Sequence, residues 1–268
     1  MPASVRFCPI ASGSNGNCIF ISYGDTHVLI DAGISGKRIE AGLNSIQATC
    51  ADIDALLITH EHSDHVQGAG ILSRRYDLPV FATEGTWRAM EKSKSIGEVA
   101  PKNKRYVYRE ENLYLNDICI HPFSIPHDAA DPVGFSVHGR DCKVVVATDI
   151  GHITEDVQRN IQEADLILLE SNHDVDMLKN GRYSYPLKKR ILGDYGHLSN
   201  VTAGELLMQA ISKRLKHVIL GHLSEENNRP ILAYETVANI LSTNHIPVNE
   251  AFMLHLAERG KVGKLLEL

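Results

Sequence analysis

The chain has 268 residues, of which 43% are hydrophobic and 22% charged, and its formal net charge is −6 at pH 7. These values are typical of a globular protein with a large core, and they exclude nucleic-acid binding through overall charge. No apolar run approaches the roughly 18 residues of a membrane span, and the start MPASVRFCPI is unlike a signal peptide. The five scattered cysteines form no CxxC pair. We therefore expect reduced thiols in a cytoplasmic protein without a membrane partner.

Short apolar runs that end in polar residues alternate with helix-forming segments along the chain. Buried strands are expected over residues 17–22, 27–33, 55–59, 141–151, 165–171 and 216–224. Helices are expected over residues 36–46, 66–76, 154–164, 201–212 and 229–242. Thr154 is a predicted cap of the third helix, and Ser199 or Asn200 of the fourth. The pattern indicates a layered α/β fold, in which ligand sites collect at strand ends.

The densest group of polar residues is THEHSDH, which follows the strand expected over 55–59. It contains His60, His62, Asp64 and His65. Histidine and carboxylate side chains are common ligands of zinc, manganese and iron. His60 and His62 point to the same side of an extended stretch, and the other two follow around a turn. Four ligands so close together suit two neighbouring ions, and the alternative is a solvated polar turn.

The motif His60-x-His62-x-Asp64-His65 resembles the signature of the metallo-β-lactamase fold. Seven further motifs resemble the YycJ/WalJ group of bacterial proteins with that fold, and they cover nearly the whole chain: ASGSNGNCIFI, DAGISGKRI, HDAADPVGF, TDIG, ESNHD, GHLSN and LGHLSEENNRP. The resemblance implies an α/β fold of four αββα layers, with two mixed β-sheets flanked by helices. It implies a single domain over residues 1–268, without the insertion that forms the clamp domain of the β-CASP RNA nucleases.

The resemblance also implies a site for two divalent ions, either zinc or manganese, held by histidine and aspartate side chains. The predicted ligands are His60, His62 and His127 for one ion, Asp64, His65 and His222 for the other, and Asp149 as a bridge. His121, six residues before His127, is the alternative at that position. Asp31 matches an aspartate that braces such a site without binding metal.

The group is associated with 5′→3′ exonuclease action on DNA and with mismatch repair. The resemblance therefore implies a two-metal phosphodiesterase whose nucleophile is a metal-bridging hydroxide, with Asp64 as a catalytic residue that holds its proton. Bound metal makes such a nucleophile available because it lowers the pKa of water to about 7. The expected partners are DNA ends, nicks or single strands, and DNA-repair proteins are further candidates.

Two stretches before the last predicted ligand point to a phosphodiester substrate. The turn GSNGN (13–17) can aim backbone N–H groups at an anion, which makes Ser14, Asn15 and Asn17 candidate substrate-binding residues, unless the turn is an ordinary one. The basic stretch KNGRYSYPLKKR (179–190) can follow a phosphate backbone while its tyrosines stack on bases. Its candidate contacts are Arg182, Lys188 and Lys189, and the alternative is a solvated charged face.

The four residues GHLS occur twice, at 196–199 and at 221–224, in different surroundings. The second copy ends a strand and presents His222 as the last predicted ligand. The first copy opens a helix, as in phosphodiesterases of this fold such as the tRNA 3′-processing endonucleases. His197 is therefore expected to contact a phosphate oxygen or to protonate the leaving 3′ oxygen, and the alternative is a structural histidine.

Other functions remain open from the sequence. The same ligands would serve a small-molecule phosphodiesterase or a thioester hydrolase, and a non-catalytic accessory protein of a cell-wall signalling system is a third reading. Polar residues near the strand ends receive no role from sequence reasoning: Glu170, Asn172, His173, Asn227 and Asn228.

Overall fold

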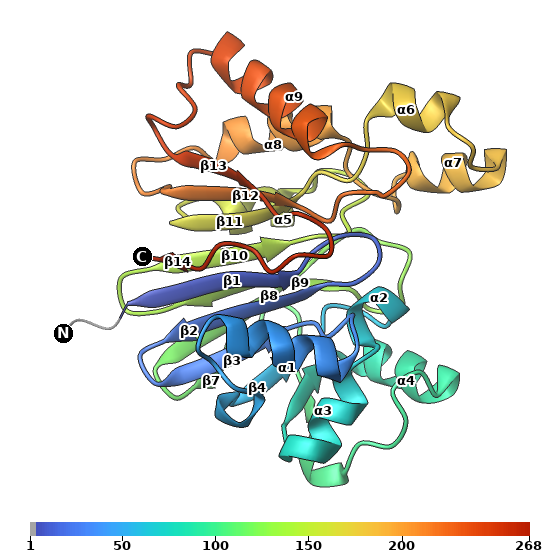
Figure 1. The fold of residues 1–268 in the computed structure, drawn as a ribbon, viewed down its shortest axis with the longest axis vertical. Helices are drawn as coiled ribbons and strands as arrows, with labels where there is room; N and C mark the ends of the chain where they lie inside the picture. Colours follow the sequence, from blue (N-terminus) through green and yellow to red (C-terminus); the bar gives the residue numbers. More distant parts are fainter. Residues whose placement is uncertain (1–3) are drawn as a thin grey trace.

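The computed structural model describes residues 4–268, and two seven-stranded sheets form its centre (Figure 1). The strand order is β14-β1-β2-β3-β4-β5-β6 in the first sheet and β13-β12-β11-β10-β9-β8-β7 in the second. The first sheet consists of β1 (Val5–Ala11), β2 (Cys18–Tyr23), β3 (Thr26–Ile30), β4 (Ala55–Leu57), β5 (Val80–Ala82), β6 (Lys104–Tyr106) and β14 (Leu266–Glu267). The second consists of β7 (Leu113–Leu115), β8 (Ile118–Ser124), β9 (Val133–His138), β10 (Lys143–Ala147), β11 (Leu166–Glu170), β12 (His217–Gly221) and β13 (Met253–Leu256).

Both sheets are mixed. In the first, β1, β2 and β3 pair antiparallel, whereas β3, β4, β5 and β6 pair parallel. In the second, β7 to β10 pair antiparallel and β10 to β13 pair parallel. Because the carboxyl ends of parallel strands lie at the same edge of a sheet, the loops after β4, β10, β11 and β12 gather at the ends of the two sheets.

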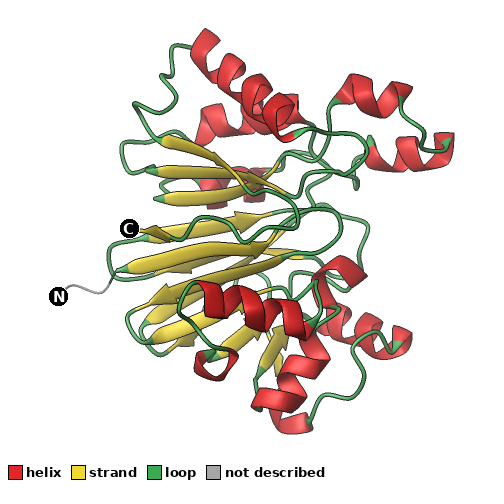
Figure 2. Ribbon diagram, viewed as in Figure 1, coloured by secondary structure: helices red, strands yellow, loops and turns green. Residues whose placement is uncertain are grey.

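Helices cover the outer face of each sheet (Figure 2). The first sheet is covered by α1 (Gly36–Ser45), α3 (Ala69–Tyr76) and α4 (Glu84–Ser93), and the second by α5 (Glu155–Ile161), α8 (Asn200–Ala210) and α9 (Pro230–Thr243). Residues of one strand alternate between two clusters, since Phe7 packs between the sheets and Cys8 packs toward the helices. The four-layer αββα fold predicted from the sequence is confirmed.

The predicted strands and helices are present, with bounds that differ from the predicted ones by a few residues. Thr154 caps α5 by accepting a hydrogen bond from the Val157 N–H, and Ser199 caps α8 by accepting one from the Thr202 N–H. Four helices were not predicted: α2 (Ser63–Val66), α4, α6 (Val175–Asn180) and α7 (Tyr185–Ile191). The helices α6 and α7 project from one end of the sandwich (Figure 1), and residues 174–195 are called the arm below. Within residues 4–268, no helix is long and apolar enough to cross a membrane.

Candidate metal centre

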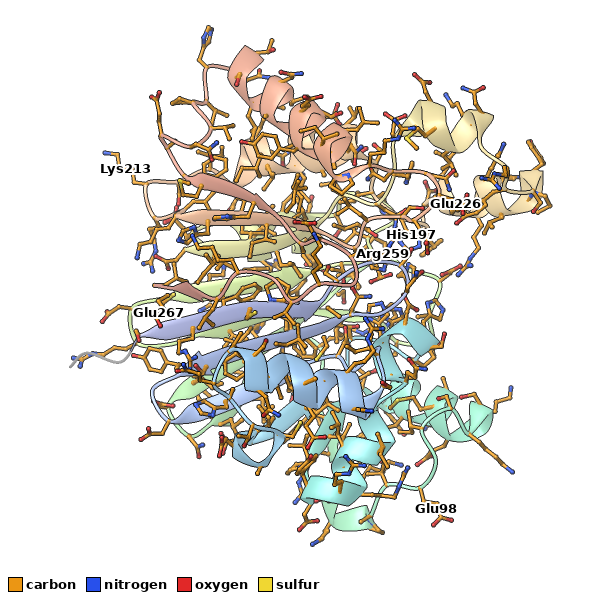
Figure 3. The ribbon with its side chains drawn as sticks, in the orientation of Figure 1. Glu98, His197, Lys213, Glu226, Arg259 and Glu267 are labelled. Atoms are coloured by element: carbon orange, nitrogen blue, oxygen red, sulfur yellow. The ribbon has the colours of Figure 1, made fainter. Side chains whose placement is uncertain are left out.

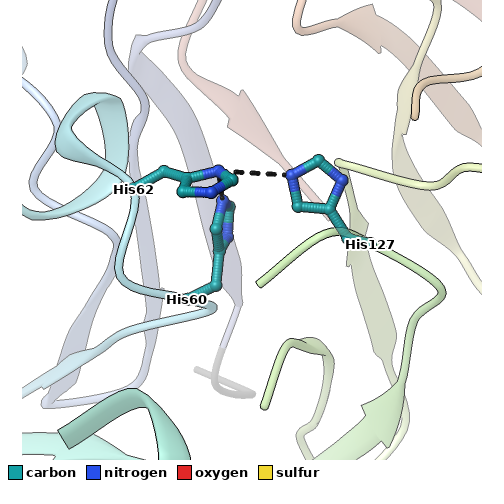
Figure 4. A group of neighbouring side chains, drawn as sticks. All are labelled: His60, His62 and His127. Atoms are coloured by element: carbon teal, nitrogen blue, oxygen red, sulfur yellow. Dashed lines mark hydrogen bonds between the residues drawn. The ribbon is translucent and has the colours of Figure 1, made fainter. Parts of the chain in front are cut away.

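Three histidines converge in the loops that follow β4 and β8. Nε2 of His60 lies 3.1 Å from Nδ1 of His62, which in turn lies 3.3 Å from Nε2 of His127 (Figure 4). The Nδ1–H of His127 donates to the Gly196 carbonyl at 3.1 Å, so Nε2 carries the lone pair in the neutral ring. Lone pairs that face one another in this way suit a shared cation. The structure brings His127 into this group, whereas His121 is turned toward Asn112 at 2.8 Å.

A second group forms where α2 begins and β12 ends. Asp64 Oδ2 lies 3.5 Å from Nε2 of His65 and 3.5 Å from Nε2 of His222. Burial would raise the pKa of Asp64, but the charges of the neighbouring His65 and His222 hold it well below its usual range. Asp64 is therefore an anion in this setting and is available as a ligand.

Asp149 lies between the two groups, just beyond the end of β10. Its Oδ2 is 3.3 Å from Nε2 of His65, and its Oδ1 is 3.6 Å from Nε2 of His222 and 3.7 Å from Nε2 of His127. The two carboxylate oxygens thus face residues of both groups, which is the position that a bridging ligand requires.

The buried polar atoms of these groups fit a divalent cation. Asp149 Oδ2 and His222 Nε2 are buried and have no hydrogen-bond partner among residues 4–268. A buried polar atom without a partner destabilises a protein by about 1–3 kcal/mol, and more when it is charged. A bound cation would satisfy both atoms, and imidazole and carboxylate donors without thiolate suit zinc or manganese.

Asp31 holds one of the predicted ligands in place, as the resemblance implied. Its Oδ2 lies 2.7 Å from Nδ1 of His65, which leaves Nε2 of that ring to face Asp64 and Asp149. Burial raises the pKa of Asp31, and the charge of His65 partly offsets that rise. The backbone N–H of Thr59 also donates to Asp31 Oδ1 at 2.9 Å. Such contacts orient a ligand ring and strengthen it as a ligand.

Three residues of the centre adopt left-handed backbone conformations where strands end. The φ angles are 62° at Asp31, 60° at Asp149 and 54° at His222. Residues with a Cβ adopt this conformation rarely, and it persists only where the surrounding structure enforces it. The sharp turn at each strand end directs the side chain into the space between the sheets' ends.

Comparisons with known proteins agree with this geometry. A family described as Beta-lactamase superfamily domain matches residues 26–223. The chain is 38% identical to the exodeoxyribonuclease YycJ of Bacillus anthracis over 94% of both chains, and 39% identical to the exodeoxyribonuclease WalJ of Streptococcus pneumoniae over 93% of both. The chain belongs to the YycJ/WalJ group of the metallo-β-lactamase superfamily. It is a metal-dependent hydrolase.

A solved structure supports the fold of this metallo-β-lactamase-fold hydrolase. The metallo-beta-lactamase fold protein YhfI of Bacillus subtilis superposes with a TM-score of 0.74 at 15% identity, over 99% of this chain and 100% of YhfI. At that identity the likeness concerns the fold alone.

Glu170, at the end of β11, links the two GHLS histidines of this metallo-β-lactamase-fold protein. Its Oε1 accepts hydrogen bonds from Nδ1 of His197 and from Nδ1 of His222, both at 2.8 Å. Burial would raise the pKa of Glu170, but the charge of His197 and these hydrogen bonds hold it well below its usual range. The His197 side chain is 18% exposed and that of His222 is 2% exposed. His197 is thus the GHLS histidine that a substrate can reach.

Sequence reasoning left Glu170 and its neighbours without a role, and the structure assigns contacts to several of them. The Asn172 side chain donates to the His222 carbonyl at 3.0 Å, and the Asn228 side chain donates to the Asn172 carbonyl at 3.0 Å. These bonds join the loop after β11 to the loop after β12, which carries His222. His173 and Asn227 are buried nearby, and their side-chain nitrogen and oxygen atoms have no hydrogen-bond partner in the described part of the chain.

Four of the five backbone N–H groups of the GSNGN turn already have partners within the protein, contrary to the expectation that successive N–H groups of the turn point at an anion. The N–H of Ser14 donates to the Leu223 carbonyl, that of Gly16 to Gly13, and that of Asn17 to Asp64. The N–H of Gly13 donates to the Asn17 side chain. The bonds of Ser14 and Asn17 hold the turn against the loops that carry His222 and Asp64, and those of Gly13 and Gly16 lie within the turn.

The side chains of that turn differ from one another in accessibility. Ser14 and Asn15 are exposed and line a pocket of about 360 Å³ beside Asp64. Asn17 is buried, and its amide nitrogen lies 3.1 Å from the Gly13 carbonyl and 3.1 Å from Nε2 of His65. Ser14 and Asn15 are therefore accessible to a substrate, whereas Asn17 holds the turn and a predicted ligand.

The predicted basic stretch forms the middle of the arm. Arg182 and Lys189 are exposed there, and Tyr185 is 79% exposed. The Lys188 ammonium donates to the Lys179 carbonyl at 2.8 Å, so its charge is tied to the arm itself. His197 lies at the same end of the molecule as the arm, and Lys213 lies at the opposite end (Figure 3).

Proposed function

We propose that the protein is a two-metal phosphodiesterase that degrades DNA in the 5′→3′ direction and acts in DNA mismatch repair. The printed names of YycJ from B. anthracis and WalJ from S. pneumoniae, both exodeoxyribonucleases, support DNA as the substrate. The polarity and the repair role follow from the resemblance to that group. Two ions of zinc or manganese are the proposed cofactors.

The observation that carries this proposal is the position of the arm beside the histidine groups. The N–H of Asp128 donates to the Tyr195 carbonyl at 3.1 Å, and His127 donates to Gly196 at 3.1 Å. A polyanion that follows the exposed Arg182 and Lys189 would therefore approach the metal centre. Exposed tyrosines on the same arm would stack on unpaired bases, which favours DNA ends, nicks or single strands.

The ligand assignment is part of the proposal. His60, His62 and His127 would hold one divalent ion, Asp64, His65 and His222 would hold the second, and Asp149 would lie between them. Bound there, the ions would lower the pKa of a coordinated water and stabilise charge on the transferring phosphoryl group.

Two side chains would move protons during the reaction. Asp64, with 24% of its side chain exposed, would accept a proton from the attacking water. Glu170 holds Nδ1 of His197, so the proton that His197 gives to the leaving 3′ oxygen would come from Nε2. General acid catalysis of this kind contributes about 10²–10⁴-fold to the rate.

One assay tests the proposed function. The purified protein is incubated with manganese or zinc and with single-stranded, nicked and double-stranded DNA, and with RNA, each labelled at either the 5′ or the 3′ end. Loss of the 5′ label as mononucleotide from the start of the reaction, with stepwise shortening of the 3′-labelled strand from its 5′ end, is the expected result. Release from the 3′ end, or cleavage of RNA alone, would contradict it.

A further inference from the structure

Arg190, the penultimate residue of α7, lies at the rim of the metal centre. Its Nε and Nη2 both donate to the Asp128 carboxylate, with Nη2 3.0 Å from Oδ1. The same Oδ1 lies 3.4 Å from Nε2 of His127. The guanidinium is therefore fixed to the residue that follows a predicted metal ligand, although the two segments are far apart in sequence.

Arg190 also experiences the charge of an acid of the second group. Its hydrogen bond with Asp128 raises its pKa, and the charge of Asp64 contributes in the same direction. In the described part of the chain, the ion-pair partners of Asp64, Asp149 and Glu170 are all histidines. Arg190 thus supplies the rim with a permanent positive charge, and Asp128 is its ion-pair partner in the described part of the chain.

Part of the guanidinium remains available to a ligand. Arginine has five N–H donors in one plane, and Asp128 occupies the edge formed by Nε and Nη2. Nη1 forms no hydrogen bond with residues 4–268, and 52% of the side chain is exposed. The free edge, formed by Nη1 and the second N–H of Nη2, matches the spacing of two oxygens of one phosphate group.

We propose that Arg190 binds the scissile phosphate at the metal centre, and that Asp128 presents its free edge. This inference rests on the proposed function, since it takes a phosphodiester as the substrate. The arm then has two distinct parts. Arg182 and Lys189 contact the DNA strand away from the reacting group, whereas Arg190 contacts the group that reacts.

This division predicts different responses to different substrates. A short chromogenic diester, bis(p-nitrophenyl) phosphate, reaches the metal centre but not the outer arm. Its cleavage should therefore depend on Arg190 and be unaffected by changes at Arg182 and Lys189. Inorganic phosphate binds without turnover, so its dissociation constant reports on Arg190 independently of catalysis.

The test compares Arg190→Ala, Arg190→Lys and Asp128→Asn with Arg75→Ala, an exposed arginine of α3 that pairs with Glu40. For Arg190→Ala, kcat/KM should fall on the order of tenfold to a hundredfold for both DNA and the small diester, and phosphate binding should weaken similarly. Bound metal per chain should stay unchanged.

Free guanidinium should restore part of the activity of Arg190→Ala, whereas the Arg190→Lys variant should recover little, because lysine cannot bind a phosphate in a bidentate manner. Asp128→Asn should lose less, since the guanidinium is still present.

Three results would overturn the inference. Normal cleavage of the small diester and normal phosphate binding by Arg190→Ala would restrict the residue to DNA contacts. If kcat/KM fell equally in Arg190→Ala and Asp128→Asn, without rescue by free guanidinium, the pair would serve only to hold the arm in place. If Arg190→Ala bound less metal than the wild type, Arg190 would instead help to position the metal ligands. If the wild type cleaves no phosphodiester, the proposed function fails, while the phosphate affinities still decide the role of Arg190.

Discussion

Nδ1 of His197 lies 2.8 Å from Oε1 of Glu170, deep at the end of β11. The same oxygen holds His222, so one carboxylate orients a predicted ligand and a candidate proton donor together. A contact of this kind fixes the tautomer of each ring and directs Nε2 away from the carboxylate. The pairing would therefore couple the proposed metal binding by His222 to the proposed protonation of the leaving group by His197, and separate substitutions can resolve the two effects.

His197→Ala should slow turnover by about 10²–10⁴-fold without loss of bound metal, because it removes the proposed proton donor and no predicted ligand. The loss should be much smaller for a p-nitrophenyl ester, since that leaving group departs without a proton. His121→Ala, which changes a histidine outside the centre, is the control. Steady-state kinetics on both substrates and metal analysis by mass spectrometry provide the measurements. A fall to one ion per chain would reassign His197 as a ligand.

Glu170→Gln should weaken metal binding as well as turnover, because it removes the charge that both His222 and His197 contact. Substitution of a residue that orients a ligand typically weakens metal affinity by about 10–100-fold. Competition with a chelator of known affinity gives the metal dissociation constant, and Glu110→Gln serves as the control. Unchanged metal affinity with reduced turnover would show that Glu170 acts on His197 alone.

His62→Ala and Asp64→Ala should each abolish turnover while the fold is retained. Both side chains lie at the mouth of the centre, outside the three apolar clusters that stabilise the sheets and helices. Circular dichroism should therefore match the wild type, whereas the bound metal should fall. Turnover at wild-type rates in either variant would refute the ligand assignment.

Removal of metal should lower the melting temperature. The buried carboxylates of Asp149 and Glu170 lie close together beside His197 and His222. The charge of Glu170 acts unfavourably on the Asp149 carboxylate, and a bound cation would offset this repulsion. A ligand at 1,000 times its dissociation constant stabilises the folded state by about 4 kcal/mol. Calorimetric melting with and without a chelator, followed by addition of zinc or manganese, measures the difference. Coincident melting curves would mean that the fold does not depend on bound metal.

Charge reversal on the outer arm should separate DNA from small substrates. The double variant Arg182→Glu and Lys189→Glu should cleave DNA poorly, with greater sensitivity at low salt, because exposed cations steer a polyanion electrostatically. Cleavage of bis(p-nitrophenyl) phosphate should persist. Lys213→Glu, at the end opposite His197 (Figure 3), is the matched control. Normal DNA cleavage by the double variant would remove the arm from the proposed DNA path.

The sequence by itself determined the features of this protein that depend on interactions between neighbouring residues. Apolar runs identify the strands, and hydroxyl side chains at Thr154 and Ser199 cap the helices that follow them. The spacing of His60, His62 and Asp64 indicates a metal site, because histidine and carboxylate side chains close together on one loop can bind the same ion or pair of ions. These features depend on a few adjacent residues, which a single sequence displays.

Only the tertiary structure shows which side chains that are distant in the sequence form hydrogen bonds with one another. Glu170 contacts rings that lie 27 and 52 residues away, and Arg190 contacts Asp128 across 62 residues. It also decided that four N–H groups of the GSNGN turn and the Lys188 ammonium already have partners within the protein. The sequence could not reveal these pairings, because they follow from strand register, left-handed turns at strand ends and the burial that forces each polar atom to find a partner.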